Sequence, residues 1–535
     1  MAPSEDTSSL RGDTTVAGTS EALPDSSKPD QPTFVEPNTP SVRRRTTDQG
    51  KRDSRRLSSL QRAMTNIMVP EKPIGKSPTA WRSIRAIIMA SPINFLLVCI
   101  PVSWALHFAT PNNDTIIFVF SFLAIVPLAK LLAFATDELS IRVGQTLAGL
   151  MNATLGNAVE LIVAIIALTK CELSIVQSSL VGSILSNLLL VLGMCFFAGG
   201  FRYSEQGFGT SAVQLNSSLL VISVIAVLLP GAFHLALQNL PSTVANETQY
   251  QEGTIDSDIL KTSRGVAIIL LFIYASYLVF QLFSHKELYN DDNTSEIQAS
   301  KKYQPGQFES MKMKNIHRRL RGKKSSPSHS ITGGEHVSSP TEEGNPMGDQ
   351  QEAAAAAEQD AGSANDSESV EPEMNITVSI GLLVVVTVFV AVTAEFLVDS
   401  INGLTESGAI GKEFVGVILL PIVGNAAEHV TAVSVSVKDK LMLSLGVAVG
   451  SSIQIALFVI PFTVTLAWIL GKPLTLLFDP LESIVLFLAV LTVNYTVADG
   501  KSNWLEGMIL MCLYIILAVT FWFYPGAPSI FQSMC

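Results

Sequence analysis

Two copies of a short motif each place one glutamate inside apolar sequence, one in each half of the chain. The first copy is Gly156-Asn157-Ala158-Val159-Glu160 and the second is Gly424-Asn425-Ala426-Ala427-Glu428. A shift of 268 residues relates them, and the same shift relates Gly182-Ser183 to Gly450-Ser451. Because a carboxylate is costly in hydrocarbon, two at matching places predict one site built from two repeats.

The residue types around the glutamates are typical of a site for a hard cation. Each asparagine precedes its glutamate by three residues, which puts amide and carboxylate on one helix face. Each glycine weakens the helix and can expose a backbone carbonyl to a ligand. Ca²⁺ binds in such all-oxygen shells, and Mn²⁺ is a second cation that the site could bind. The absence of a Cys or Met cluster disfavours Cu and Zn. The predicted metal ligands are three equivalent residues from each motif: Gly156, Asn157, Glu160, Gly424, Asn425 and Glu428.

The same two glutamates are predicted to couple cation movement to protons. A divalent cation between ionised Glu160 and Glu428 gives a nearly neutral site, whereas two bare carboxylates cannot both stay ionised cheaply in a low dielectric. Protons and the cation would therefore compete for the same oxygens, and two carboxylates permit two protons. Protonated acids kept for packing are the alternative, but acids inside a membrane are more often functional.

Seven further polar residues are candidates for lining the ion path, although each has a simpler explanation. The small residues of the next helix in each half suit helix packing about as well as ligand lining. A lone histidine can titrate near neutral pH but is more often just hydrogen-bonded, and an acid near a span end can simply face water. The candidates are Ser183, Ser186, Ser451, Gln454, Glu138, Glu395 and His429.

Composition and hydropathy predict an all-α polytopic membrane protein that positions these residues. The chain has 535 residues, 48% of them hydrophobic, and a mean hydropathy of +0.38. About 20 apolar residues cross a bilayer core, and eleven segments are long enough for a transmembrane helix: 88–108, 115–135, 144–169, 173–198, 212–235, 264–284, 376–400, 413–437, 441–470, 481–499 and 504–524.

The spans divide the chain into five predicted parts. A disordered, basic, Ser- and Pro-rich tail (1–82) precedes six spans (84–284), and a loop that is first basic and then acidic (285–375) separates these from five spans (376–525) and a short tail (526–535). The basic tail predicts a cytosolic N-terminus and central loop, with the C-terminus across the membrane. Asn246 then lies in a far-side loop where glycosylation is allowed.

Charge and motifs limit the partners and exclude some classes of function. The net charge of −11 combines acids before the second apolar block with bases near the N-terminus, and it does not indicate a nucleic-acid partner. The basic stretch suits a tail beside anionic lipid, or a merely solvated tail. Arg55-Arg56-Leu57-Ser58 matches a kinase-site pattern, although such patterns are common by chance. The five cysteines are scattered, which predicts neither a structural disulfide nor a zinc site. The sequence contains neither a Walker A motif nor an Asp-Lys-Thr-Gly phosphorylation motif. It therefore predicts neither an ATP-driven pump nor another enzyme.

At these residues the chain resembles the calcium (cation):proton exchangers of vacuolar membranes, within the wider cation/Ca²⁺ exchanger superfamily. The resemblance covers about residues 84–525 and rests on the two motifs together with Ala135–Ser140 and Ala394–Ser400. It implies one extra span followed by two inverted five-helix repeats, with an acidic segment between them. It also implies that Glu160 and Glu428 exchange Ca²⁺ for H⁺ at the centre of a vacuolar membrane, with no permanently bound cofactor.

Two other functions stay open at this point. Sodium/calcium exchangers usually carry Asp where this chain has Glu428, which favours protons, but an Mn²⁺ or Na⁺-coupled exchanger on the same fold remains an alternative. A cation channel is the alternative from a different class, although nothing in the sequence is typical of a selectivity filter. The oligomeric state is not indicated by the sequence.

Overall fold

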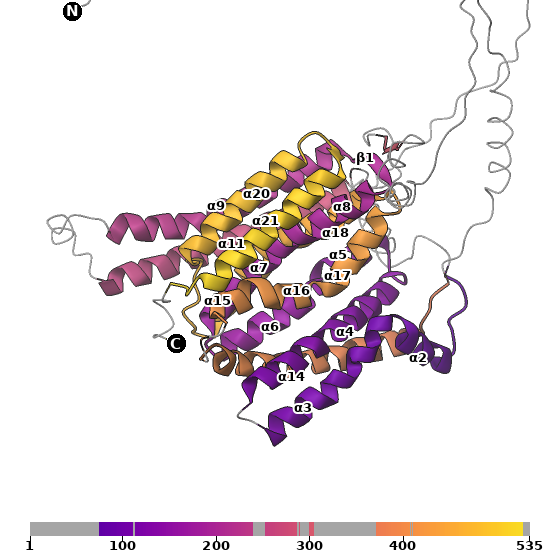
Figure 1. Ribbon diagram of the computed structural model, residues 1–535, viewed down its shortest axis with the longest axis horizontal. Helices are drawn as coiled ribbons and strands as arrows, with labels where there is room; N and C mark the ends of the chain where they lie inside the picture. Colours follow the sequence, from indigo (N-terminus) through magenta and orange to yellow (C-terminus); the bar gives the residue numbers. More distant parts are fainter. Residues whose placement is uncertain are drawn as a thin grey trace, which may run out of the picture. The chain divides into compact units, whose positions relative to one another are not determined.

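The computed structural model resolves the apolar segments into long helices (Figure 1). It describes residues 74–110, 113–238, 252–285, 288, 299–303, 371–406, 408, 410–527 and 535, all within one unit of the chain, residues 60–535. Most of the predicted basic tail with Ser58, most of the central loop, and Asn246 lie outside the described residues.

One group of helices packs the first helices of the N-terminal half against the first helix of the C-terminal half. The long helix α14 (Ile376–Glu406) packs lengthwise on α4 (Asp114–Ser140), and Figure 1 shows both beside α3 (Cys99–Ala109). The Trp104 indole donates to Thr393 Oγ1 at 3.2 Å across this interface. A 3₁₀ turn, η1 (Pro92–Val98), and a separate helix, α2 (Ala80–Met89), precede α3, so helix begins before the predicted end of the tail at residue 82.

A second group contains both motifs, and its members occur in the same order in each half. In the first half these are α5 (Gln145–Leu155), α6 (Ala158–Thr169), α7 (Leu173–Leu185), the π-helical turn η2 (Ser186–Val191) and α8 (Leu192–Gly200). In the second half they are α15 (Lys412–Phe414), the π-helical turn η5 (Val415–Leu419), α16 (Leu420–Gly424), α17 (Ala426–Ser436), α18 (Leu441–Gln454), the π-helical turn η6 (Ile455–Val459) and α19 (Ile460–Ile469). Such π-helical turns are frequent at functional sites.

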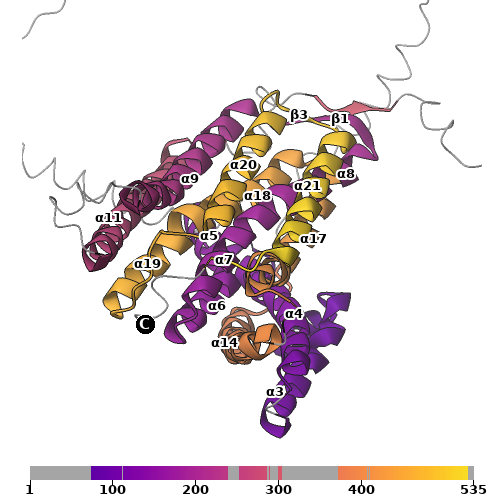
Figure 2. The same cartoon turned by 60° about the vertical axis from the view of Figure 1, so that its left-hand side comes forward.

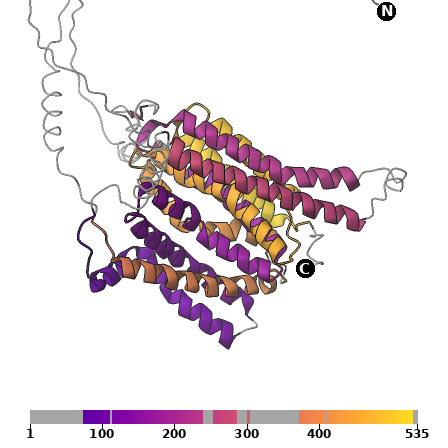
Figure 3. The ribbon, with the colours of Figure 1, turned by 180° about the vertical axis from the view of Figure 1, so that it is seen from behind.

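Four further helices cover this core. Figure 2 shows α20 (Pro480–Thr496), α18 and α21 (Trp504–Phe523) one after another. Seen from behind in Figure 3, α9 (Thr210–Gln238) and α11 (Glu252–Val279) run side by side, and α11 ends in a π-helical turn, η3 (Phe280–Ser284).

A small antiparallel sheet departs from the all-α prediction. Its strands are β1 (Tyr203–Gly207), β2 (Lys301–Lys302) and β3 (Lys501–Ser502), in the order β2-β1-β3. Lys301 Nζ donates to Glu205 Oε2 at 2.7 Å, and this hydrogen bond lowers the pKa of the Glu205 carboxyl. The sheet therefore holds residues 301–302 of the central loop against β1, which follows the end of α8.

The helix lengths support a polytopic membrane protein but not the number eleven. Among the described residues, eight helices are long and apolar enough to span, or nine if the bent pair Lys412–Gly424 and Ala426–Ser436 is one span. The two other predicted spans, 144–169 and 481–499, are shorter helices: α5 and α6 have 11 and 12 residues, and α20 has 17. A break in the first motif is what shortens α5 and α6.

The prediction that the chain has no structural disulfide is wrong. Cys171, in the turn between α6 and α7, is bonded to Cys535 across a sequence separation of 364 residues. Lys472 Nζ donates to Cys171 Sγ at 2.7 Å, so the start of the segment after α19 lies at the same end of the helices. Cysteine spacing alone cannot indicate a bond that only the folded chain makes feasible.

Candidate cation site

Each motif breaks a helix, and its glutamate is the third residue of the helix that follows. The first break separates α5 from α6 at Gly156 and Asn157, and the second separates α16 from α17 at Asn425, where the helix axis bends by 58°. Glu160 and Glu428 therefore lie in the first turns of α6 and α17. Because a helix N-terminus carries partial positive charge, both carboxylates sit where an anion is favoured.

The two halves meet where Glu160 contacts the second break. Glu160 is only 8% exposed, and a Cβ added to Gly424 would lie 2.7 Å from its Oε1. Only glycine leaves room for this carboxylate against the backbone of the other half. Glu428 is near enough to interact electrostatically with Glu160, and neither makes a salt bridge with a basic residue among the described parts of the chain. The structure therefore joins the two predicted acids in one site.

A small cavity lies beside Glu160. Its volume is about 20 Å³, enough for one occupant the size of a water molecule. Its polar side chains are those of Glu160, Ser179 and Ser183, and the remainder of its lining, apart from Gly424, is apolar. We call it the cation cavity.

The first asparagine is held by the second half of the chain. Asn157 occupies the N-cap position of α6, but its side chain makes no capping bond. Its Nδ2 donates to Gln454 Oε1 at 2.6 Å, and Ser451 Oγ donates to its Oδ1 at 2.7 Å. Asn187 Nδ2 in turn donates to Ser451 Oγ at 3.1 Å. Ser451 and Gln454, predicted as lining residues, thus position a predicted ligand.

The equivalent asparagine has no such partners. Asn425 is 1% exposed, and neither its Oδ1 nor its Nδ2 has a hydrogen-bond partner among the described residues. Glu428 Oε2 and Asn187 Oδ1 are likewise buried and accept no hydrogen bond there. Buried polar atoms normally have partners, and a buried oxygen without a donor is the kind of atom that a hard cation binds.

The approaches to the site differ in the two halves. On one side η5 and α16 pack closely on α7, and most of their side chains are buried. On the other side, no α5 residue whose burial is described is buried, and α18 makes no comparable contact with α5. A Cβ on Gly450 would meet no described atom within 4 Å. The close contact of η5 and α16 with α7, at the disulfide end, therefore has no counterpart between α18 and α5 among the described residues.

Of the other predicted residues, Ser186 and His429 lie next to the site, whereas Glu395 and Glu138 lie elsewhere. Ser186 Oγ lies 3.4 Å from His429 Nε2, next to the site. Glu395 is away from the cation cavity, where its carboxylate lies 3.3 Å from Lys170 Nζ, which also pairs with Asp399.

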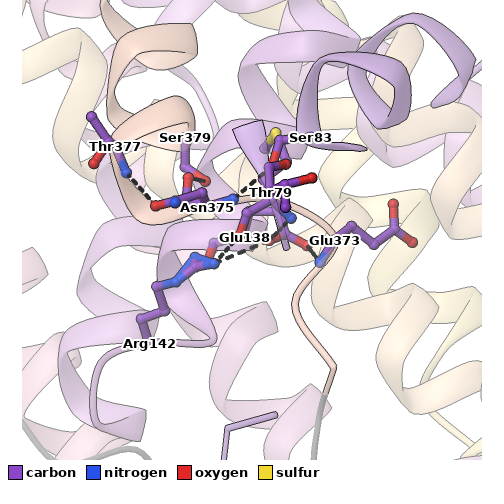
Figure 4. Close-up of polar contacts among 9 residues, drawn as sticks. Thr79, Ser83, Glu138, Arg142, Glu373, Asn375, Thr377 and Ser379 are labelled. Atoms are coloured by element: carbon purple, nitrogen blue, oxygen red, sulfur yellow. Dashed lines mark hydrogen bonds and ion pairs between the residues drawn. The ribbon is translucent and has the colours of Figure 1, made fainter. Parts of the chain in front are cut away.

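Glu138 does not line the cation cavity and instead makes structural contacts near the start of α14. Figure 4 shows it between Arg142 and the segment before α14, where it accepts the amides of Glu373 and Met374 at 3.1 Å each. Next to it, the Asn375 amide donates to Ser83 Oγ at 3.0 Å. Glu138 is 4% exposed, so it fixes the start of α14 rather than facing water.

Two residues of the site were missed by the sequence analysis. Ser179 lines the cation cavity and Asn187 supports Ser451. The shift of 268 residues pairs them with Val447 and Ile455, so the repeat gave no signal for either. The signal for Asn187 was its place directly after Ser186 in the polar face that begins at Gly182-Ser183.

Comparison with known proteins gives consistent similarities. Residues 113–283 and 378–523 match the family model described as sodium/calcium exchanger protein. A vacuolar calcium ion transporter of Cryptococcus neoformans var. grubii is 51% identical, with 94% of this chain and 87% of that protein covered. A Ca²⁺/H⁺ antiporter of Synechocystis sp. is 38% identical over 80% of this chain and 96% of its own length. A solved structure of the Ca²⁺/H⁺ antiporter protein YfkE is 26% identical, covers 82% of this chain and 100% of that chain, and has a TM-score of 0.55.

Proposed function

This chain belongs to the sodium/calcium exchanger protein family, and from that premise we propose that it is a Ca²⁺/H⁺ antiporter that moves cytosolic Ca²⁺ into an acidic vacuole. The resemblance indicated by the two motifs is confirmed. The observation that carries the proposal is the pair Glu160 and Glu428, one from each half, at two helix breaks with no basic partner among the described residues.

The geometry supports exchange of one ion for the other. With both glutamates ionised, the site holds two negative charges and several oxygens without donors, which suits a divalent cation. Without the cation, the closeness and burial of the two acids favour uptake of protons from water. Ca²⁺ and protons therefore alternate on the same carboxylates. Ca²⁺, with Mn²⁺ as a competitor, is the substrate and H⁺ is the counter-ion.

We also propose eleven spans, arranged as one extra helix and two inverted repeats. The closed contact of α7 with η5 and α16 has its equivalent, by the shift of 268 residues, in α18 and α5. Transport would exchange these two arrangements, so that α18 closes on α5 while η5 and α16 separate from α7. The present structure is then the state open to the cytosol.

The disulfide supports the proposed orientation. Disulfides persist in compartments of the secretory route and are rare in cytosol. Cys171 and Cys535 lie at the same end of the helices as Lys472, which makes this end lumenal. The N-terminus and central loop are then cytosolic, as the basic residues of the tail predict.

Labelling of Cys171 tests this orientation. In intact vacuoles, a variant that keeps only Cys171 and Cys535 should react with an impermeant maleimide only after reduction and permeabilisation. The matched control adds Lys302→Cys, an exposed position of β2 on the cytosolic side, which should react without permeabilisation. Labelling of Cys171 from outside intact, reduced vacuoles would contradict the orientation.

Uptake of ⁴⁵Ca²⁺ into vesicles containing the purified protein tests the function. With an acidic interior, uptake should be accompanied by interior alkalinisation, and a protonophore that collapses the gradient should stop it. Uptake that persists after collapse would point to a channel or another counter-ion. Na⁺-loaded vesicles and competition with Mn²⁺ then separate the remaining exchangers.

A further inference from the structure

A second and larger cavity lies at the disulfide end of the helices. Its volume is about 540 Å³, and it is bounded by α7, α9, α20 and the segment between α19 and α20. Most of its wall is apolar, but Ser178, Glu413 and Glu482 form a polar part of its lining. We call it the outer cavity and the two acids the outer pair. Neither acid belongs to the Gly-Asn-Ala motifs.

The outer pair lacks the donors that two ionised carboxylates need. Glu482 is 1% exposed, and neither of its oxygens has a donor among the described residues. Glu413 is 6% exposed, and its Oε2 accepts the hydroxyl of Ser178 at 2.5 Å. Both carboxyl groups line the outer cavity, and they are close enough to interact electrostatically. Because Ser178 has a single hydroxyl proton and donates it to Glu413, any hydrogen bond between the two acids needs a further proton on one of them.

The charged neighbours do not neutralise the outer pair. Asp479 accepts the amides of Leu481 and Ala527 and the hydroxyl of Tyr524, and it lies near enough to act on Glu482 electrostatically. Lys412 directs its Nζ to Glu172 Oε2 at 2.6 Å and also donates to Asn402.

One further titratable group, His234 of α9, lines the outer cavity. Lys412, which precedes Glu413 in the sequence, already pairs with Glu172. Two buried carboxyl groups that lack a basic partner favour binding a proton.

The outer pair also lies beside the contact that closes the site. Glu413 is two residues before η5, and a Cβ on Gly416 would lie 2.5 Å from Ser178 Cβ, so α7 and η5 touch here. Ser178 lines the outer cavity, whereas the adjacent Ser179 lines the cation cavity. Helix α7 therefore separates the two cavities, and any force between Glu413 and Glu482 acts next to this closure.

We propose that Glu413 and Glu482 form a second proton-binding site, distinct from the cation site, that takes a proton from the lumen and so favours closure of η5 on α7. The lumenal position of this site rests on the proposed function. The proton comes from lumenal water and returns to it, and no other bond changes. When the proton leaves, two buried like charges repel each other and push α15 and η5 away from α20.

Infrared pH-difference spectra of the purified full chain test proton binding without reference to transport. In a Glu160→Gln/Glu428→Gln background, which removes the signals of the cation site, a protonated-carboxyl band should decrease as pH rises. Adding Glu482→Gln should remove that band. Adding Asp258→Asn is the matched control and should leave it, because Asp258 pairs with Lys261 and neither residue lines the outer cavity. If Glu482→Gln fails to fold, Glu413→Gln takes its place. A band that the folded variant leaves unchanged would overturn the inference.

Transport adds a second readout. With cytosolic pH fixed, Glu482→Gln should shift the midpoint of the dependence of ⁴⁵Ca²⁺ uptake on lumenal pH by at least about one unit, a tenfold change in proton concentration. The amide stays neutral and can still donate to Glu413. An unshifted midpoint in a variant that transports would count against the coupling to closure. No proton-dependent uptake by wild type would instead refute the proposed function, while the infrared result would stand.

Discussion

Replacing either central acid, by Glu160→Gln or Glu428→Gln, is expected to reduce the initial rate of ⁴⁵Ca²⁺ uptake by about 100-fold or more. Each variant leaves a divalent cation with one buried carboxylate instead of two. Removing one partner of a buried charge pair costs roughly 3–5 kcal/mol, and each 1.4 kcal/mol is a factor of ten. Uptake per molecule of reconstituted protein, with an acidic interior, gives the measurement.

Two controls accompany these variants. Size-exclusion profiles should match that of wild type, because glutamine keeps the shape of glutamate. Asp258→Asn removes an acid at the start of α11 that pairs with Lys261 near the surface, and uptake should remain normal. If either Glu160→Gln or Glu428→Gln transported at the wild-type rate, the assignment of the site would have to be abandoned.

The second large effect is expected from Gly182→Ala. A Cβ at Gly182 would meet the carbonyl oxygen of Val417 and lie 2.7 Å from Val417 C and Pro421 Cγ. Backbone atoms cannot move aside cheaply, so the methyl group should push η5 and α16 from α7. Overpacking of this kind typically costs 1–3 kcal/mol. We expect a lower Tm of the Ca²⁺-free protein in detergent, together with loss of most uptake.

Its matched control is Gly450→Ala, the equivalent position of the other half. No described atom lies within 4 Å of a Cβ there, so the Tm should stay unchanged. Uptake should nevertheless be slower, because in the opposite state Gly450 would take the place that Gly182 has now. Equal losses of Tm in both variants would contradict the difference between the two halves. Normal uptake by Gly450→Ala would contradict the exchange of closed contacts between them.

What could be predicted from the sequence was the part that depends on residue type alone. The repeated Gly-Asn-Ala-x-Glu motif indicated which acids meet, and its glycines indicated where the helix is weakened, although both spans were expected to continue through the motif. The apolar segments located every long helix among the residues that the structure describes. These features follow from local composition, and they do not depend on which of its states the protein adopts.

The rest depends on how the two halves are arranged in one state. Equal motifs suggested equal surroundings, yet Asn157 has two partners in the other half and Asn425 has none among the described residues. Glu138 looked like an acid that could face water or the ion path, because its partners, the amides of Glu373 and Met374, are distant in sequence. The outer pair was missed because Glu413 and Glu482 lie at the ends of different spans.

The Cys171–Cys535 bond also joins the two halves of the chain into one covalent loop. A single cut anywhere between these residues, including in the central loop, leaves two fragments that stay attached. On a gel run without reductant, such a nicked molecule would keep its full mass, and it would fall apart into its halves only after reduction. Two separately synthesised halves could likewise become permanently linked once they pair in an oxidising compartment.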